Sequence, residues 1–278
     1  FPNDARVATL NAAKDAGLNV SHLINEPTAA ALYYAKESGE NLSGPICVYD
    51  LGGGTFDVSI VQLKDNEVEV ISTEGVHYLG GTDFDKKLQD YVIKKFKDEK
   101  NKKISTKDFK LLDAEELKIS LSKREEKTIG VKNTNIKISR QEFEDLISTD
   151  LAMIEMVCEA ALENSKLKAS DINQIILAGG STRIPCVRKS IKKVFGKDPI
   201  SFNNPDELMA LGAAIYAGHK ADHDLLNSMP QKTVEKIKYS DITSKYFGYL
   251  ALRYDEKTEV EELSNYVLIE KGEKIPVS

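Results

Sequence analysis

The sequence contains no tryptophan, only three cysteines and no long apolar run. The cysteines, Cys47, Cys158 and Cys186, stand far apart and form no C-x-x-C pair, which excludes a zinc or disulfide framework and favours small buried thiols in a reducing compartment. No apolar run approaches the roughly eighteen residues of a membrane-spanning helix. We therefore expect a protein without a membrane partner in the cytoplasm, with an organelle lumen as the alternative.

An excess of positive charge is also missing. The chain carries 38 lysines and arginines against 44 aspartates and glutamates, a formal net charge of −6. The lysine-rich run over residues 94–103 also contains acids and is typical of a solvated helix end. Because the whole molecule has no basic field, we expect no nucleic-acid partner.

Helix-like and strand-like segments alternate along most of the 278 residues, which indicates an α/β fold. Apolar spacing and helix-breaking residues predict helices over residues 4–16, 26–38, 82–96, 140–162, 182–195 and 204–218. Strands are predicted over residues 19–24, 45–51, 56–63, 67–75, 127–131, 135–139 and 172–180, and again in the tail after residue 241. Two capping boxes, Thr82 with Asp85 and Ser139 with Glu142, are predicted to open two of the helices.

Glycine gathers in three clusters that end or follow predicted strands: Gly52–Gly54, Gly80–Gly81 and Gly179–Gly180. Glycine lets backbone N–H groups face an anion at close range. One such cluster is what any tight turn requires, but three at the strand ends of one α/β fold favour a phosphate site. No G-x-x-x-x-G-K-[ST] occurs, and "LGGGTFD" precedes a strand rather than a helix, which excludes a Walker loop and a dinucleotide fingerprint.

Acidic and hydroxyl side chains surround the first cluster. Asp50 ends one predicted strand, and Thr55 and Asp57 lie at the start of the next. Carboxylates beside a phosphate require a hard cation between them, most often Mg²⁺, and a carboxylate there can orient an attacking water. Each acid alone is as readily a turn former or cap. Glu26, just before Pro27, is either a helix N-terminal charge or part of this site.

Five segments, in this order, resemble the 70-kDa heat-shock chaperone family: "INEPTAAALYYA", "VYDLGGGTFDVSIV", "LGGTDFDKKL", "ILAGGSTRIPCVRKSIKKVFG" and "NPDELMALGAAIYAG". The resemblance runs from Phe1 to about Gly218. It implies an actin-like ATPase (ribonuclease H-like) fold in which ATP lies between two lobes. It also implies that ATP hydrolysis controls a peptide-binding β-domain.

The resemblance implies roles for the residues around the first cluster. Asp50 would hold Mg²⁺ through water and help orient the attacking water, and Glu26 would join the water shell of the metal. Thr55 would lie near the γ-phosphate, and Asp57 would help place a cation. The residues implied to contact phosphate are Gly52, Gly53 and Gly54.

It further implies a set of nucleoside contacts. These are Gly179, Gly180, Ser181, Arg183, Asp206, Glu115, Lys118 and Ser122. Arg183 would pack against the base, Asp206 would close that pocket, and the three residues of "AEELKISLS" would reach ribose or base. The implied cofactors are ATP or ADP with Mg²⁺, and K⁺ is a further candidate cation. The implied partners are unfolded client peptides, a J-type co-chaperone and a nucleotide-exchange factor.

The resemblance and the composition together predict a domain division. Residues 1–219 form a partial nucleotide-binding domain: 1–40 are a remnant of its first lobe, and 41–219 are mostly the second lobe, with a helical subdomain at about 82–135. The polar residues 220–240 are a linker, and 241–278 begin a substrate-binding β-domain. Because the chain opens directly into a helical pattern at Phe1, we expect it to be part of a longer protein.

The 278 residues depart from the family in two respects. They contain no D-L-G-T-T-like first phosphate hairpin with its catalytic lysine, so we expect the chain itself to be a weak or inactive ATPase. The segment 220–240 is longer and more polar than the family's D-L-L-L-L-D linker. Two alternatives stay open: a non-catalytic module that docks a co-chaperone or exchange factor, and another ATPase of actin-like or sugar-kinase fold.

Overall fold

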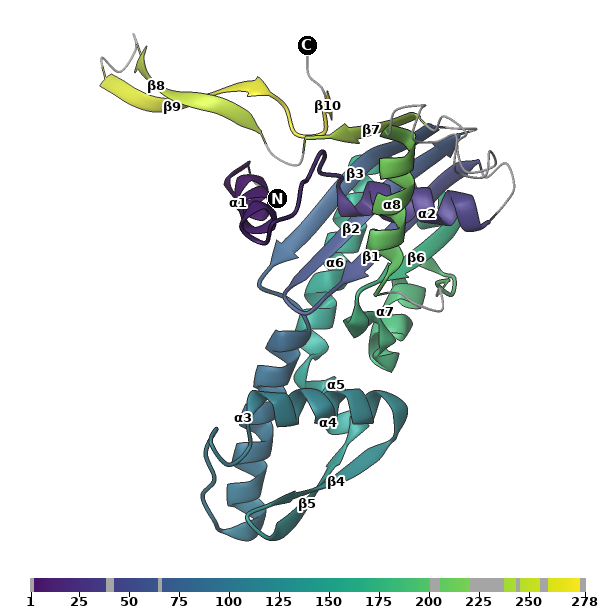
Figure 1. Ribbon diagram of the computed structural model, residues 1–278. Coiled ribbons are helices and arrows are strands. Elements are labelled where there is room, and N and C mark those ends of the chain that lie inside the picture. The colour runs from purple at the N-terminus through teal and green to yellow at the C-terminus, as the bar shows by residue number, and fades with distance from the viewer. Residues whose placement is uncertain are drawn as a thin grey trace.

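The centre of the molecule is a six-stranded mixed β-sheet (Figure 1). The computed structural model describes residues 3–38, 43–64, 67–200, 206–220, 238–243, 246–255 and 260–275. The sheet has the order β10-β7-β3-β2-β1-β6. Its strands are β1 (Gly44–Leu51), β2 (Thr55–Lys64), β3 (Glu67–His77), β6 (Gln174–Ala178), β7 (Lys238–Ile242) and β10 (Lys274–Ile275).

The first three strands, all predicted from the sequence, form an antiparallel meander. β6 adds to the outer side of β1 in parallel, and β7 adds to the first residues of β3 in parallel. The register places Leu51 opposite Phe56, so the glycines between these two residues make the β1–β2 turn. The sheet therefore brings this turn to the same edge as the carboxyl end of β6.

Different helices cover the two faces of the sheet (Figure 1). These helices are α2 (Glu26–Glu37), α8 (Leu208–Lys220), α6 (Ser148–Ser165) and α7 (Pro185–Phe195). Ile46 and Val48 of β1 pack in the core under α2 and α8, whereas Cys47 and Tyr49 pack in the core under α6 and α7. Because side chains alternate along a strand, β1 is buried on both faces, which agrees with its nearly continuous apolar sequence.

The contact between α2 and α8 is very close. A Cβ atom on Gly212 of α8 would overlap the backbone of Ala29 in α2, so only glycine fits there. Small residues at positions 210 and 212–214 of the sequence favour such a close approach.

A helical arm extends from one end of the sheet (Figure 1). It consists of α3 (Gly81–Lys100), α4 (Leu111–Lys123), β4 (Glu126–Val131), β5 (Thr134–Ser139) and α5 (Arg140–Leu146). Its apolar residues, among them Phe84, Leu117 and Phe143, belong to the same core as the α6 face of the sheet. The arm is therefore packed continuously onto the central sheet.

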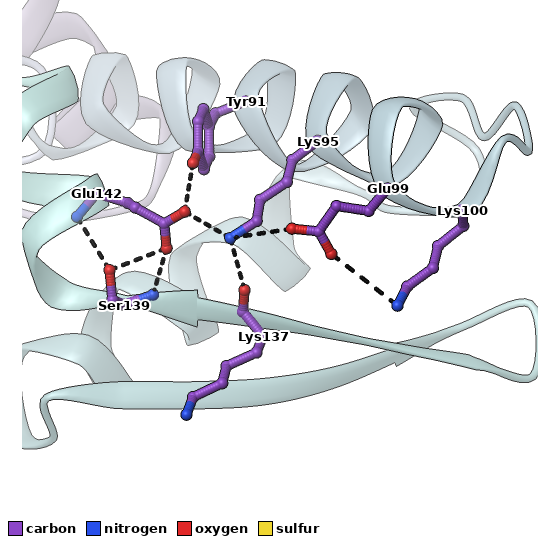
Figure 2. Close-up of polar contacts among 7 residues, drawn as sticks. All are labelled: Tyr91, Lys95, Glu99, Lys100, Lys137, Ser139 and Glu142. Carbon is purple, nitrogen blue, oxygen red and sulfur yellow. Dashed lines mark hydrogen bonds and ion pairs between the residues drawn. The ribbon is translucent and has the colours of Figure 1, made fainter.

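Figure 2 shows the polar network that joins α5 to α3 in this arm. The Glu142 carboxylate accepts hydrogen bonds from Tyr91 Oη (2.5 Å), Lys95 Nζ (2.5 Å) and the Ser139 backbone N–H (2.8 Å), and Lys95 also donates to the Lys137 carbonyl (2.8 Å). Burial alone would raise the pKa of Glu142, but these donors outweigh it and lower that pKa to about 2. The predicted Ser139–Glu142 capping box is confirmed, since Ser139 Oγ accepts from the Glu142 N–H (3.2 Å).

The tail contributes to the sheet and then leaves it. β7 pairs with β3, and Asp241 accepts a hydrogen bond from Thr28 Oγ1 of α2 (2.5 Å). The antiparallel hairpin of β8 (Phe247–Asp255) and β9 (Val260–Ile269) projects away from the sheet (Figure 1) before β10 returns to pair with β7. Residues 238–240, which we expected in a linker, are thus the start of a strand, and Gly272 lies in a turn with φ 90°.

Residues 19–24 were predicted to be a strand, and that prediction is wrong. They connect α1 (Asn3–Asp15) to α2, and Val20 is 37% exposed. A strand requires a neighbour for its backbone groups, and no strand of the described residues pairs with this segment. The predicted end of α1 at Gly17 is confirmed by its φ of 77°.

The long helix predicted after Ser139 is two helices. Ile147, with φ −101° and ψ 7°, separates α5 from α6. Its side chain is fully buried in the core. Since an apolar residue stands at the bend, the apolar spacing alone does not reveal the break.

The start of α3 also differs from its prediction. The Gly80 N–H donates to the Asp83 carboxylate (3.1 Å), and the helix begins at Gly81. The predicted capping box of Thr82 with Asp85 is therefore wrong, because Asp85 is buried and bonded elsewhere. Gly39, the predicted stop of α2, and Asn204 with Pro205, the predicted start of α8, lie outside the described residues. No helix within the described ranges is long and apolar enough to cross a membrane.

Candidate functional site

The turn between β1 and β2 presents bare backbone to open space. The Gly52 N–H donates to the Thr55 carbonyl (3.1 Å) and closes the turn. A Cβ atom on Gly54 would meet no atom within 4 Å, and one on Gly52 or Gly53 would come no closer than 3.8 Å to any neighbour. The turn therefore has room on its outer side for a ligand that approaches the backbone.

The other two glycine clusters meet this turn. The Gly52 carbonyl accepts hydrogen bonds from the Gly81 N–H (3.0 Å) and from Ser181 Oγ (2.9 Å), and the Gly53 carbonyl accepts from the Thr82 N–H (2.7 Å). We call this meeting of residues 52–53, 81–82 and 181 the glycine junction. Segments up to 129 positions apart in the sequence are thus joined at one point.

Three carboxylates gather beside the junction. Asp50 of β1 lies directly opposite Asp57 of β2, and both point to the face that α2 covers, where Glu26 begins that helix. Burial, and then the charges of Glu26 and Asp57, raise the pKa of Asp50 to about 7. Burial and the charge of Asp57 raise the pKa of Glu26. The three groups therefore repel one another when all are ionised.

Asp57 is partly compensated. Burial raises its pKa, while a hydrogen bond with Thr55 and the charge of His77 act in the opposite direction. Within the described ranges, no group of three or more His, Cys, Asp or Glu side chains is arranged to ligate a metal ion directly.

A buried ion pair adjoins the glycine junction. Lys118 Nζ of α4 lies 2.8 Å from both carboxylate oxygens of Asp85 of α3 and donates to the Gly81 carbonyl at 3.0 Å. The side chains of Lys118 and Asp85 are only 10% and 6% exposed. Burial raises the pKa of Asp85, and the hydrogen bond and charge of Lys118 oppose that rise.

A second ion pair lies at the carboxyl end of β6. Arg183 Nη2 lies 2.7 Å from Asp206 Oδ2, and both side chains are more than half exposed. Gly179, with φ 81°, and Gly180 connect β6 to Arg183. A Cβ atom on Gly180 would lie 3.8 Å from Asp206 and 3.9 Å from Arg183, so the pair stands over bare backbone.

A model of the Hsp70 protein family matches residues 1–258 of the chain. The chain belongs to the Hsp70 family. It is 41% identical over 253 residues to the chaperone protein DnaK of Burkholderia cenocepacia, in an alignment that covers 83% of this chain and 39% of that relative. The chain thus spans about two fifths of the length of this DnaK. Membership of the Hsp70 family confirms the α/β, actin-like ATPase fold expected from the motifs, and the family implies nucleotide binding with Mg²⁺.

The structure brings together most of the residues that the Hsp70 resemblance singled out. The residues at or beside the glycine junction are Asp50, Gly52, Gly53, Gly54, Thr55, Asp57, Glu26, Gly179, Gly180, Ser181 and Lys118. Arg183 and Asp206 form their own pair next to Gly180. Ser122 donates to the Lys118 carbonyl of its own helix (2.9 Å), and Glu115 is exposed on α4, so neither contacts the junction directly.

Two residues that bond at the glycine junction or to Lys118 beside it were missed from the sequence. Asp85 was read as a helix cap, although it pairs with Lys118, and Gly81 was not proposed as a contact, although both its N–H and its carbonyl are bonded at the junction. For Gly81 the signal was present in the second glycine cluster. For Asp85 no local signal exists, since its partner is 33 positions away.

Proposed function

We propose that this chain supplies the second-lobe half of the nucleotide site of an Hsp70-type chaperone, in which ATP binding and hydrolysis are coupled to the binding of unfolded peptide. The observation that carries the proposal is the glycine junction, where three glycine segments join beside three mutually repelling carboxylates. Backbone N–H groups around bare glycines favour phosphate, and the carboxylates favour a cation next to it.

The residues present fit MgATP or MgADP. The outer side of Gly52–Gly54 is open enough for phosphate to approach the backbone. The raised pKa values of Asp50, Glu26 and Asp57 fall when a dication lies nearby, because the dication favours their charged forms. Arg183 offers a planar guanidinium that can stack on a base, and Asp206 already orients it.

Each side chain has a definite part in this proposal. Bound Mg²⁺ would neutralise charge on the phosphates. Asp50, ionised beside the cation, would accept a hydrogen bond from the water that attacks the terminal phosphate, and Glu26 would orient the metal's water shell. Thr55 holds Asp57 in place through its hydroxyl and would lie near the terminal phosphate.

The proposal also covers the binding partners and the cellular location of the protein. An Hsp70 parent would bind unfolded client peptides and be regulated by a J-type co-chaperone and a nucleotide-exchange factor in the cytoplasm. In this proposal residues 1–219 form part of the nucleotide-binding domain and residues 241–278 begin the peptide-binding β-domain. K⁺ beside Asp57 belongs to the same proposal.

Nucleotide-dependent melting tests the half-site directly. We expect millimolar ADP with Mg²⁺ to raise the melting temperature of the 278-residue chain, because ligand that binds only the folded state stabilises it. Asp50→Asn should reduce the Mg²⁺-dependent part of that rise, whereas Asp90→Asn, an exposed residue of α3, should leave it unchanged. No shift at millimolar ADP would count against the half-site.

Steady-state hydrolysis tests the expected weakness of the chain as an ATPase. The 278 residues contain no match to the family's first phosphate hairpin and catalytic lysine, so half of the phosphate contacts would be absent in this chain. We expect a rate close to that of buffer alone. A robust rate that Asp50→Asn abolishes would show that these residues suffice for hydrolysis.

A further inference from the structure

We propose that Asp85 is a positioning residue for the nucleotide: it holds the ammonium group of Lys118 at the glycine junction, where Lys118 presents its remaining donor to the bound ligand. The proposal rests on the nucleotide site proposed above. It concerns a residue that the sequence motifs assigned only to helix capping.

The ammonium group of Lys118 lies at the glycine junction. An ammonium group has three N–H donors, and here one points to Asp85 and one to the Gly81 carbonyl. A Cβ atom on Gly81 would lie 3.0 Å from Lys118 Nζ and 2.6 Å from Ser181 Oγ, so the ammonium group sits against the junction itself. The two printed hydrogen bonds use two of these donors, and in this proposal the third donates to an oxygen of the nucleotide.

The ion pair of Asp85 and Lys118 costs free energy because both charges are buried. Burying two charges costs several kcal/mol per ion before their attraction is counted. Asp85 Oδ1 is buried 2.8 Å from the Lys118 ammonium group but accepts no hydrogen bond of good geometry. The charge of Glu115 on α4 further disfavours an ionised Asp85. Replacing a buried ion pair with well-packed apolar side chains is often neutral or stabilising.

The helices α3 and α4 do not need this ion pair to stay together. Phe84 and Leu88 of α3 and Leu117 and Leu121 of α4 are fully or almost fully buried in one core. Those contacts join the two helices without Asp85. What the ion pair adds is a fixed place for one ammonium group at the meeting point of three glycine segments.

The test is a double-mutant cycle read out as affinity for ADP with Mg²⁺, measured by titration of the 278-residue chain. Asp85→Asn keeps the shape of the side chain and removes its charge, and Lys118→Met removes the donor. We expect each variant to weaken ADP binding by about tenfold, the usual cost of losing one charge-assisted hydrogen bond. Combining the two should weaken binding no further, because Asp85 acts only through Lys118.

Two controls separate positioning from folding. Asp85→Glu, which restores the carboxylate, should bind ADP within about threefold of the wild type, a difference below 1 kcal/mol. Asp90→Asn makes the same chemical change on an exposed position of the same helix and should have no effect. Melting temperatures without nucleotide report the structural effect of each change separately.

Wild-type affinity in Asp85→Asn would overturn the proposal, and so would a further loss when this change is added to Lys118→Met. If Asp85→Asn does not fold, Asp85→Ser, which also removes the carboxylate, takes its place in the cycle with the same expected results. Wild-type affinity in that variant, or a further loss when it is added to Lys118→Met, would overturn the proposal. Absence of ADP binding by the wild-type chain would overturn the nucleotide site and this proposal with it.

Discussion

Asp50 makes the stability of the fold depend on pH. Its pKa in the folded protein is about 7, against 3.8 for an unperturbed carboxyl, because it is buried and faces Glu26 and Asp57. The folded state therefore holds this proton more tightly than the unfolded state does. Its contribution is fully present below pH 4 and is lost as the pH rises towards 7.

Asp50→Asn should consequently stabilise the nucleotide-free protein above pH 7. We expect a gain of roughly 1–3 kcal/mol in the free energy of unfolding at pH 8 and little difference at pH 4. Urea denaturation at the two pH values measures it. Addition of Mg²⁺ and ADP should favour the wild type instead, since only its carboxylate interacts with the cation. A variant less stable than the wild type at pH 8 without ligand would contradict this account of Asp50.

Tyr78 holds an unfavourable backbone conformation at the rim of the same site. It lies between β3 and the glycine junction with φ 65°, and its side chain is 91% exposed. A left-handed conformation costs a non-glycine residue about 1–2 kcal/mol, and glycine avoids that cost at an entropic penalty of about 0.5–1 kcal/mol. Tyr78→Gly should therefore raise the free energy of unfolding by about 0.5–1 kcal/mol.

Asn101 is the matched comparison, because it also has a positive φ of 51° but tolerates it as the C-cap of α3. Asn101→Gly should give a smaller gain in the same urea experiment. An equal or larger gain at Asn101 would show that Tyr78 is not specifically strained.

Residues close together in the sequence were the ones whose place in the site could be predicted. Asp50, the three glycines and Asp57 lie within eight positions, and the hairpin that joins them follows from local alternation and turn chemistry. The role of Asp85 could not be predicted in this way, because it depends on how α3 crosses α4. Propensity and spacing carry no information about such a crossing.

At the scale of elements, the start of α3 can lie directly against the β1–β2 turn because Gly80 has no side chain. A Cβ atom on Gly80 would lie 2.6 Å from the Gly53 carbonyl carbon and 2.7 Å from the Gly54 nitrogen. The φ of Gly80 is −173°, which any residue adopts, so the constraint is the contact and not the conformation. Backbone atoms on the opposite side cannot move away without shifting the turn.

Gly80→Ala should therefore displace the β1–β2 turn and remove most of the ADP-dependent rise in melting temperature. We also expect a loss of roughly 1–3 kcal/mol in the free energy of unfolding, the usual cost of overpacking. Gly218→Ala in α8, where an added Cβ meets no atom within 4 Å, is the control and should be neutral or slightly stabilising. An unchanged ADP response in Gly80→Ala would argue that the turn is not part of the binding site.

The elements themselves were predictable where the signal is local. The strands β1, β2 and β3, the helices α3 and α7 and the end of α1 follow from apolar patterns, helical spacing and glycine stops. Residues 19–24 were wrongly predicted because an apolar alternating segment becomes a strand only when another strand lies beside it. β7 was missed for the opposite reason: its polar sequence is held in the sheet by pairing with β3, far away in the sequence.

At the scale of the whole molecule, two parts of the chain are tied to the sheet very differently. The helical arm shares the main core with α6 and β1. The contacts of the tail include the short pairing of β7 with β3, the hydrogen bond from Thr28 to Asp241 and the ion pair of Lys274 with Glu69 (2.5 Å). The β8–β9 hairpin is a separate two-stranded sheet. A two-stranded hairpin is marginal alone in water, so this hairpin depends on what packs against it.

Both faces of the β8–β9 hairpin are apolar. Leu252 and Leu263 lie directly opposite each other and are 62% and 65% exposed, and Tyr249 stacks on Tyr266 on the other face. Exposed apolar area of this kind drives association. We therefore expect the 278-residue chain to self-associate at concentrations of tens of micromolar, as measured by sedimentation velocity.

Leu252→Lys combined with Leu263→Glu should reduce this association, because the pair replaces apolar area with opposite charges that still face each other across the strands. Leu112→Lys on α4 is the control: Leu112 is also 62% exposed but lies on the helical arm, so its replacement should leave the association unchanged. A wild-type chain that stays monomeric at every concentration of the sedimentation series would contradict the prediction. An equal effect of Leu112→Lys would move the contact surface from the hairpin to the arm.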